Sequence, residues 1–327
     1  MSKAVEFLGS EKESARVGAI LALERIAADS PRDHHTIFEQ LSGFVKQRRF
    51  KKDCEIGAVE RDILLALNVI GRRRLRKQSS QIDLSQCDFR GIRLRYGFFE
   101  NVNFFESNFD GASIFDCSFS ESNLIRASFL GCIIKNSDFS KSKFQNSILD
   151  NARFSDCILK RCDFTRTKVR SMTIGASNLS GSKFVSNKFI KAEIFNVRLK
   201  NCIFSSLTFE DSTIKNSILS KSIWNQCEIS DSTIRNSNFS CSFFRKTKLL
   251  SAKLYGNSFK RSRLENLHAV NSSLLNSDLR KAKLILCTLP EVNFRGSKGR
   301  GLFIFKTPLS QQQKISLNVP KFFPIDS

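Results

Sequence analysis

The chain has 327 residues, 41% of them hydrophobic, which is enough to bury a core, and its formal net charge is +22 at pH 7. This excess of Lys and Arg is spread along the chain and makes polyanions possible partners. The longest apolar stretch, Ile63 to Ile70, is interrupted by Asn68 and falls far short of the roughly 20 residues of a membrane-spanning helix. No basic segment followed by an apolar one opens the sequence, so we expect a cytoplasmic protein without a secretory signal.

Apolar residues return at intervals of three and four near the start of the chain, which predicts amphipathic helices. The first helix should run from Ser10 to Ala28, with Ser10 and Glu13 forming a capping box. A second helix should begin at Ser30 and Pro31, an N-cap followed by a proline at the first helical position, and end near Lys46. The predicted apolar faces are Val17, Ile20, Leu21, Leu23, Ile26 and Ala27 in the first helix, and Ile37, Phe38, Leu41, Phe44 and Val45 in the second.

A third helix should start near Asp53, after the basic loop 47–52. Its predicted buried face is Ile56, Val59, Ile63, Leu64, Leu67 and Ile70. Three such helices with short connections make a small helical cap. The adjacent His34 and His35 point in different directions on a helix, which favours packing or capping over a metal site.

A dense basic run follows the third helix: Arg72, Arg73, Arg74, Arg76 and Lys77. Cations are favourable at a helix C-terminus, so these residues are interpreted first as helix-end and surface charges. The alternative is a contact with phosphate or with an acidic protein. A Ser79-Ser80 linker then leads into the repeat.

From Ile82 to Gly296 an apolar residue returns at every fifth position without an insertion or deletion. The 43 positions from Leu84 to Phe294 hold 18 Phe, 15 Leu and 7 Ile, with Val169, Trp224 and Ala269 as the exceptions. Two residues before each of them stands a small residue, mostly Ser, Ala, Cys or Thr, which places both on one side of an extended segment. The charged residues occupy the other three positions and should face outward. A unit this short cannot bury its own apolar residue, so the units must stack into a solenoid.

The ten cysteines follow the same repeat and contain no C-x-x-C pair. Eight of them occupy the small position of a pentad, so we interpret them as small buried residues and not as metal ligands or disulfides. They are Cys87, Cys117, Cys132, Cys157, Cys162, Cys202, Cys227 and Cys287.

The repeat resembles that of the pentapeptide-repeat proteins, whose unit is written A(D/N)Lxx. Close matches are Cys87-Asp88-Phe89, Ser107-Asn108-Phe109, Ser122-Asn123-Leu124, Cys162-Asp163-Phe164 and Ser277-Asp278-Leu279. The resemblance implies an all-β solenoid, a right-handed four-sided (quadrilateral) parallel β-helix with four pentads per coil, here preceded by a small N-terminal α-helical cap. Phe144, Phe164, Phe184, Phe204, Trp224 and Phe244 would then fall in one core column, with Trp224 as a core residue and not a ligand platform.

Both ends of the chain are also similar to segments of such proteins. The stretch 16–27 and the following 29–34 resemble a helical module that precedes the repeats in many bacterial members. The segment 309–313 and Val319-Pro320 resemble their short terminal helix and proline-containing tail. We therefore expect a helical module over 1–79, the β-helix over 80–297 and a capping tail over 298–327, with the tail and Pro290 shielding the last coil.

Four pentads per coil allow the surface charges to be sorted by side. The side through Phe99 has 10 basic and 4 acidic residues, whereas the side through Phe89 has 6 basic and 8 acidic residues. The candidate basic binding face consists of Lys141, Lys160, Arg161, Arg198, Lys200, Lys221, Lys260, Arg261, Arg280 and Lys281. Plain solvation of these charges is the alternative.

No catalytic motif accompanies the repeat: the sequence has no G-x-S-x-G, no H-E-x-x-H and no phosphate-binding glycine loop. We predict a protein that is not an enzyme and needs no catalytic, metal or cofactor site, no cofactor and no small-molecule substrate. The leading hypothesis is a scaffold for protein–protein interaction with an unidentified partner. The alternative is binding of nucleic acid or another polyanion along the basic face. Some pentapeptide-repeat proteins imitate DNA, which requires an acidic surface, whereas this chain is basic.

Overall fold

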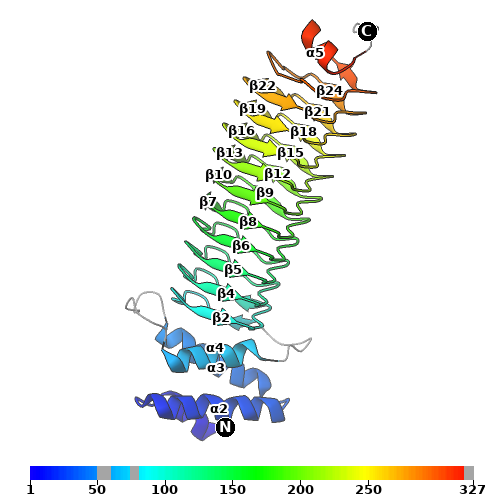
Figure 1. Cartoon of the computed structure of the whole chain (residues 1–327). Helices are drawn as coiled ribbons and strands as arrows, with labels where there is room; N and C mark the ends of the chain where they lie inside the picture. Colours follow the sequence, from blue (N-terminus) through cyan, green and yellow to red (C-terminus); the bar gives the residue numbers. More distant parts are fainter. Residues whose placement is uncertain (50–59, 74–80, 320–327) are drawn as a thin grey trace. The chain divides into compact units, whose positions relative to one another are not determined.

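The computed structural model describes residues 1–49, 60–73 and 81–319 (Figure 1). The chain divides into two compact units, the first from Met1 to Ile148 and the second from Leu149 onward. The first unit contains the helices and the first coils of a parallel β-solenoid, and the second contains the later coils and a terminal helix. The expected division into three domains stays a prediction.

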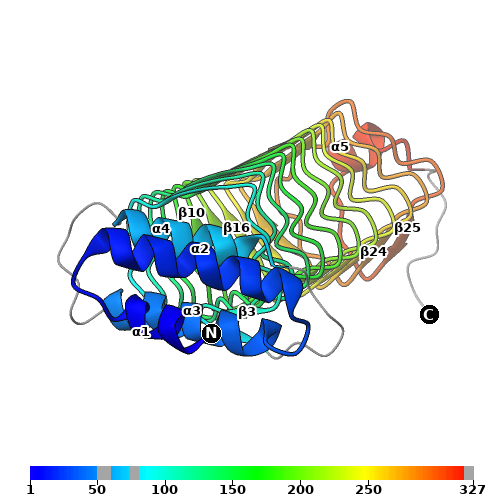
Figure 2. The same ribbon diagram turned by 90° about the horizontal axis from the view of Figure 1, so that it is seen from below.

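Four helices open the first unit: α1 (Ser2–Leu8), α2 (Glu13–Asp29), α3 (His34–Arg48) and α4 (Arg61–Gly71). Figure 2 looks onto the helical end of this unit, where α2 packs on α3 and α4, and α3 contacts the first coil. None of the helices in the described ranges is both long and apolar enough to span a bilayer. The sequence pattern did not predict α1.

The predicted capping box of the first long helix is wrong. Helix α2 starts at Glu13 with Lys12 as its N-cap residue, and no side chain caps it. The reason is that the Arg16 guanidinium donates hydrogen bonds to the carbonyls of Ser10 and Glu11, which holds this segment as a turn ahead of the helix.

The next helix also begins later than predicted. Asp33, and not Ser30, is the N-cap residue of α3, which ends at Arg48. The Ser30 hydroxyl accepts a hydrogen bond from the backbone N–H of Asp33 and donates one to its carboxylate, so residues 31–33 form a turn before the helix. The predicted face of this helix is confirmed, since Ile37, Phe38, Leu41, Phe44 and Val45 are all buried.

The interior of the helical part comes from α2, α3 and α4. In α2 the residues Ala19, Ile20, Leu23 and Ala27 are buried, whereas Leu21 is 49% exposed and does not belong to the apolar face. In α4 the predicted Ile63, Leu67 and Ile70 are buried. Asp53, Ile56, Val59 and the basic residues Arg74, Arg76 and Lys77 lie outside the described residues.

The coils of the first unit are built from short parallel strands and single bridges. Their strands are β1 (Ile82–Asp83), β2 (Arg93–Arg95), β3 (Val102–Asn103), β4 (Ser113–Phe115) and β5 (Ile133–Lys135). Strand β1 pairs with β3, and β4 with both β2 and β5, always twenty residues apart. One coil therefore contains four pentads, which confirms the predicted four-sided parallel solenoid.

The second unit repeats the same geometry in three sheets and one row of bridges. The β15 sheet contains β9 (Lys183–Val185), β12 (Ile203–Ser205), β15 (Ile223–Asn225), β18 (Phe243–Arg245), β21 (Arg263–Glu265), β24 (Lys283–Ile285) and β25 (Phe303–Phe305). The β10 sheet contains β7 (Lys168–Arg170), β10 (Lys188–Ile190), β13 (Thr208–Glu210), β16 (Glu228–Ser230), β19 (Lys248–Leu250) and β22 (His268–Val270). The β17 sheet contains β6 (Arg153–Ser155), β8 (Thr173–Gly175), β11 (Glu193–Phe195), β14 (Thr213–Lys215), β17 (Thr233–Arg235), β20 (Lys253–Tyr255) and β23 (Ser273–Leu275).

The core consists of the two inward positions of each pentad. The large apolar residues are buried throughout, and the small residues that precede them are buried as well. The small residues also join neighbouring coils: the Ser182 hydroxyl donates to the carbonyl of Leu159 at 2.7 Å and accepts from the N–H of Cys162 at 3.0 Å. Their hydrogen bonds therefore add to the apolar burial that the sequence pattern indicated.

The corners between pentads use left-handed backbone conformations. Asn196, Asn216 and Asn236, for example, have φ angles of 56°, 52° and 51°. Asn adopts such angles at lower cost than most residues because its short polar side chain bonds locally. At position 256 the corner is Gly with φ of 64°, and an added Cβ would lie 2.6 Å from Oδ1 of Asn236.

The solenoid continues one strand beyond the predicted repeat. Strand β25 pairs with β24, so the coil geometry reaches Phe305. Helix α5 (Gln311–Ser316) follows, with a capping box formed by Ser310 and Gln313. The expected short terminal helix is thus present. The predicted tail residues 320–327 lie outside the described residues.

Candidate functional site: the basic side of the second unit

Nine of the ten predicted face residues lie in the second unit, and Lys141 lies in the first. The nine residues of the second unit lie in or beside a row of parallel bridges. This row joins Asn178, Arg198, Ile218, Asn238, Ser258, Asp278 and Lys298 in successive coils. We call the outward residues of this row, at positions 158–161 and every twenty residues to 298–301, the basic side. Leu199 and Phe259 of the same segments point inward and are buried, which is why the flanking cations point outward.

The basic side of the second unit is strongly cationic. Arg161, Arg198, Lys200 and Lys221 are exposed, and Lys260 and Arg280 are partly exposed. Asp278 is the one acidic residue at these positions. It binds Arg280 at 2.7 Å, and this hydrogen bond holds the pKa of the Asp278 carboxyl below its ordinary value. The remaining positive charges have no acidic residue within the row to balance them.

The equivalent positions of the first unit, considered by themselves, have the opposite sign. Their outward residues include Glu100, Glu121 and Asp138, and their one cation, Lys141, forms an ion pair with Glu121 at 2.6 Å. Lys141 therefore sits in acidic surroundings within its own unit.

Two further basic residues, Lys298 and Arg300, belong to the basic side. Lys298 is bridged to Asp278, and both cations are exposed. Both residues lie beyond Gly296, the predicted end of the repeat, and were therefore not among the predicted face residues, although they stand twenty residues after Asp278 and Arg280.

The described part of the basic run after the third helix has a structural role. Arg73 is buried and donates hydrogen bonds to the carbonyls of Ile70, Phe98 and Glu100, which ties α4 to the first coil. Burial lowers the pKa of Arg73 to about 10, and Glu100 offsets this only in part. Arg72 forms a two-pronged contact with the Glu24 carboxylate.

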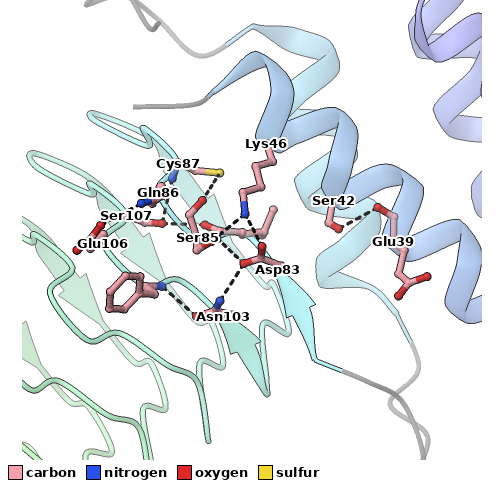
Figure 3. A network of polar contacts seen from close by, with 12 residues as sticks. Glu39, Ser42, Lys46, Asp83, Ser85, Gln86, Cys87, Asn103, Glu106 and Ser107 are labelled. Carbon is pink, nitrogen blue, oxygen red and sulfur yellow. Dashed lines mark hydrogen bonds and ion pairs between the residues drawn. The ribbon is translucent and has the colours of Figure 1, made fainter. Parts of the chain in front are cut away.

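Other charged contacts join the helices to one another and to the coils. Arg16 and Asp62 form a buried ion pair between α2 and α4. Arg49 donates to the carbonyl of Asp88 at 2.7 Å. Figure 3 shows Lys46 of α3 reaching Asp83 and Ser85 of the first coil. These charged residues therefore hold the helices of the first unit to one another and to its first coil.

The prediction that His34 and His35 pack or cap is confirmed by packing for His34, whereas His35 pairs with an acidic side chain. The buried His34 ring lies 4.7 Å from the ring of Phe38, and His35 contacts Glu39 at 3.0 Å. His268 is exposed on β22. A cavity of about 210 Å³ lies between the helices, lined by Glu24, Ala27, Ala28, His34, Phe38, Val69, Arg72 and Arg73.

All eight cysteines assigned to the small position are buried, which confirms their predicted location. Burial raises the pKa of Cys132 and Cys202 to about 12, and that of Cys227 to about 11. Within the described ranges, no three His, Cys, Asp or Glu residues form a group that could hold a metal ion. Cys241 is the exposed cysteine of the described ranges.

Comparison with known proteins finds two matching sequence families, both described as pentapeptide repeats. One, of 9 copies, matches residues 119–168, and the other, of 8 copies, matches residues 82–120 and 258–296. No curated protein matches the chain.

Several solved structures are similar to this chain. One is QnrB1, a plasmid-mediated fluoroquinolone resistance protein, with 16% identity over 62% of this chain and 87% of that chain, and a TM-score of 0.32. Another is HetL, a pentapeptide repeat protein involved in heterocyst differentiation regulation in the cyanobacterium Nostoc sp., with 15% identity over 70% of this chain and 88% of that chain, and a TM-score of 0.26.

Proposed function

Because the chain belongs to the pentapeptide-repeat proteins, we propose that it is a non-catalytic scaffold that binds a protein partner through its outer sides. The observation that carries this proposal is the fixed twenty-residue register. In the β15, β10 and β17 sheets each outward residue lies beside its counterpart in the next coil, as Thr213 lies beside Thr233. Surface side chains therefore form ordered arrays on a hydrogen-bonded framework, which favours recognition of a macromolecule. A cytoplasmic location belongs to the same proposal.

The test is capture of a partner from a cell extract, followed by binding measurements with that purified partner. Three variants probe the three sheets of the second unit: Ile223→Arg on β15, Lys188→Glu on β10 and Thr233→Arg on β17. Each changed residue is outward-facing and at least partly exposed, so the fold should persist, which circular dichroism checks. The proposal predicts saturable binding that one of these variants, or the basic-side variant below, weakens at least about tenfold. Turnover of a substrate that depends on a surface residue would overturn it.

The second candidate function is binding of nucleic acid or another polyanion along the basic side. It is favoured by the row of cations from Lys160 to Arg300 in the second unit, which contains Asp278 as its one acidic residue. Lysine and arginine residues that neutralise phosphates release counterions, so such binding must weaken steeply with salt. The row lacks exposed aromatic residues, which argues against stacking on unpaired bases.

Binding to duplex DNA and to heparin across a salt series tests this candidate. One variant reverses the charge of Lys160, Arg161, Lys200, Lys260 and Arg261. Its matched control reverses five cations of the β10 side, Lys168, Arg170, Lys188, Lys191 and Lys248, and thus has the same net charge. The candidate requires weaker binding and a smaller salt slope for the first variant only. Equal losses of affinity for the two variants would mean that binding depends on the net charge of the protein and not on the basic side.

A further inference from the structure

An exposed apolar column lies on the outer face of the β15 sheet. Ile203, Ile223 and Phe243 stand directly opposite one another in three successive coils. Ile203 is 38% exposed, Ile223 is 44% exposed and Phe243 is partly exposed. We call these three residues the apolar column. At the equivalent outward position the β10 sheet has Thr208, Glu228 and Lys248, and the β17 sheet has Thr213, Thr233 and Lys253.

Several positive charges flank this column, and Glu265, an acidic residue of the same sheet, lies beside Arg245 in the next coil. Lys183 precedes Ile203 in the same ladder and Arg263 follows Phe243, so a cation stands at each end. Arg263 lies over the Phe243 ring at 5.5 Å and is paired with Glu265. Lys221 lies two residues before Ile223, and Arg245 lies two residues after Phe243. The segments 201–206, 221–226 and 241–246 contain no acidic residue.

The column has a length and spacing that suit an α-helix. Neighbouring parallel strands lie about 4.8 Å apart, so the three side chains span roughly 10 Å. One turn of an α-helix rises about 5.4 Å, so residues i, i+4 and i+7 of a helix parallel to the column would cover nearly the same span. Acidic residues on both flanks of such a helix would meet Lys221 on one side and Arg245 on the other.

We propose that the apolar column is a docking site for an acidic amphipathic helix of a partner protein. This inference rests on the proposed scaffold function and names the surface and the chemistry of its partner. The apolar ridge of the helix would cover Ile203, Ile223 and Phe243, and its carboxylates would face the surrounding cations. Charge complementarity sets the orientation and the choice of partner, whereas burial of the apolar side chains supplies most of the affinity.

The test uses a fluorescently labelled, helix-stapled peptide with Leu at i, i+4 and i+7 and Glu on both flanks. Binding to the full chain is followed by fluorescence anisotropy. The expected result is saturable binding that Ile223→Ser weakens by about tenfold or more. Ile218→Ser is the matched control, because Ile218 is an isoleucine of the second unit that is 41% exposed but lies in the basic side. It should leave the affinity unchanged.

Two further arms test the charges. The double variant Lys221→Glu/Arg245→Glu should weaken binding of the acidic peptide, and a peptide with Lys in place of Glu should not bind. Sedimentation of the wild type and of Ile223→Ser tests whether a second copy of the chain covers the column instead. The proposal is overturned by equal losses for Ile223→Ser and Ile218→Ser, by equal binding of the Lys peptide, by no binding, or by self-association that Ile223→Ser abolishes.

The two proposals can fail separately. Suppose that a captured partner binds, that only variants of another side weaken its binding, and that the acidic peptide does not bind. The docking-site proposal is then wrong, whereas the proposed scaffold function is supported. If no partner binds on any side and the peptide also fails, both are wrong.

Discussion

Trp224 is stacked on Phe204, with ring centroids 4.1 Å apart and planes inclined by 26°. On its other side lies Phe244, with centroids 5.5 Å apart and planes inclined by 12°. The indole is fully buried, and its Nε1 has no hydrogen-bond partner among the described residues. Trp224 therefore contributes to the core through ring contacts and apolar burial alone, as the sequence analysis expected.

The first prediction concerns the size and polarity of this side chain. Trp224→Ala should lower the free energy of unfolding by about 3–5 kcal/mol, because it removes the stacked ring and leaves a cavity. Trp224→Phe should cost less than about 1.5 kcal/mol, because it keeps a ring in the column and removes the unpaired N–H. Urea unfolding followed by circular dichroism measures both values, with the surface variant Gln226→Ala as control. Equal stability of the Ala and Phe variants would contradict this account.

The second prediction is acid sensitivity of the first coil. Burial is the largest single cause and raises the pKa of the Asp88 carboxyl, but the hydrogen bonds from Arg90 and the charges of Arg90 and Arg49 together lower it more, so the net pKa lies below the ordinary value. The pKa of Asp83 is shifted in the same direction: burial is the largest single cause and raises it, but the hydrogen bonds from Lys46 and Ser85 and the charge of Lys46 together lower it more. Because these pKa values are lower in the folded state, both carboxylates stabilise the fold above about pH 4, and this contribution disappears as the pH falls through the folded-state values.

Thermal melting between pH 6 and pH 3 should therefore show a decreasing midpoint. Asp88→Asn should melt at a lower temperature than the wild type at pH 6, since it weakens the contact with Arg90, and should lose less on acidification. Asp156→Asn, at an exposed corner, is the control. An identical pH profile for the wild type and Asp88→Asn would rule out this role for Asp88.

The five-residue spacing of Phe99, Phe104 and Phe109 was sufficient to predict a solenoid, whereas the four sides of each coil were predicted from the resemblance to pentapeptide-repeat proteins. Each apolar residue that recurs at intervals of five occupies the inward position of its pentad. The pattern therefore predicts which side of every segment is buried. The helix ends were less predictable, because Arg16 binds the carbonyls of Ser10 and Glu11 from one turn further along the chain. Arg16 is itself held by its buried ion pair with Asp62 of α4, and this tertiary contact leaves no local sequence signal. The hydrogen bonds of Arg16 to these carbonyls outweigh the capping preference of Ser10.

The candidate surfaces were predictable to different degrees. The cations of the basic side followed from the four-sided register, but the acidic neighbours of Lys141 became evident only when the two units were considered separately. The apolar column was overlooked because a single outward Ile, such as Ile203, is ordinary in one pentad. Its significance depends on Ile223 and Phe243 lying beside it twenty and forty residues later.

The third prediction concerns thiol reactivity. The thiolate is the reactive form of cysteine, and burial raises the pKa of Cys132, Cys202 and Cys227 far above neutrality. Cys241 is exposed. Cys54 lies outside the described residues, so the test uses a Cys54→Ser background. In this background a thiol reagent at pH 8 should modify one cysteine per folded chain, and Cys241→Ser should abolish this reaction. Denaturant should make the remaining thiols reactive. Rapid modification of the folded Cys241→Ser chain would show that the coils open.

The fourth prediction concerns the C-terminal cap. The Gln313 side chain is buried, and its Nε2 donates to the carbonyls of Leu289 and Val292 at 2.9 and 3.1 Å. Gln313→Ala should leave these carbonyls without their donor and also remove half of the capping box of α5, at a cost of about 1–3 kcal/mol. The last coils should open first, since each coil of a solenoid is supported by its neighbours.

A substitution at Gly299, which lies against Leu317 just after α5, tests the same cap. A Cβ added at this residue would lie 2.2 Å from the carbonyl oxygen of Leu317, so Gly299→Ala must displace the end of α5. We expect both variants to become sensitive to proteolysis near the C-terminus, with faster amide exchange in β24 and β25 and unchanged exchange in β10 and β13. Gln312→Ala, at an exposed position of the same helix, should behave as the wild type. Uniform exchange over all strands would mean that the cap protects no particular coil.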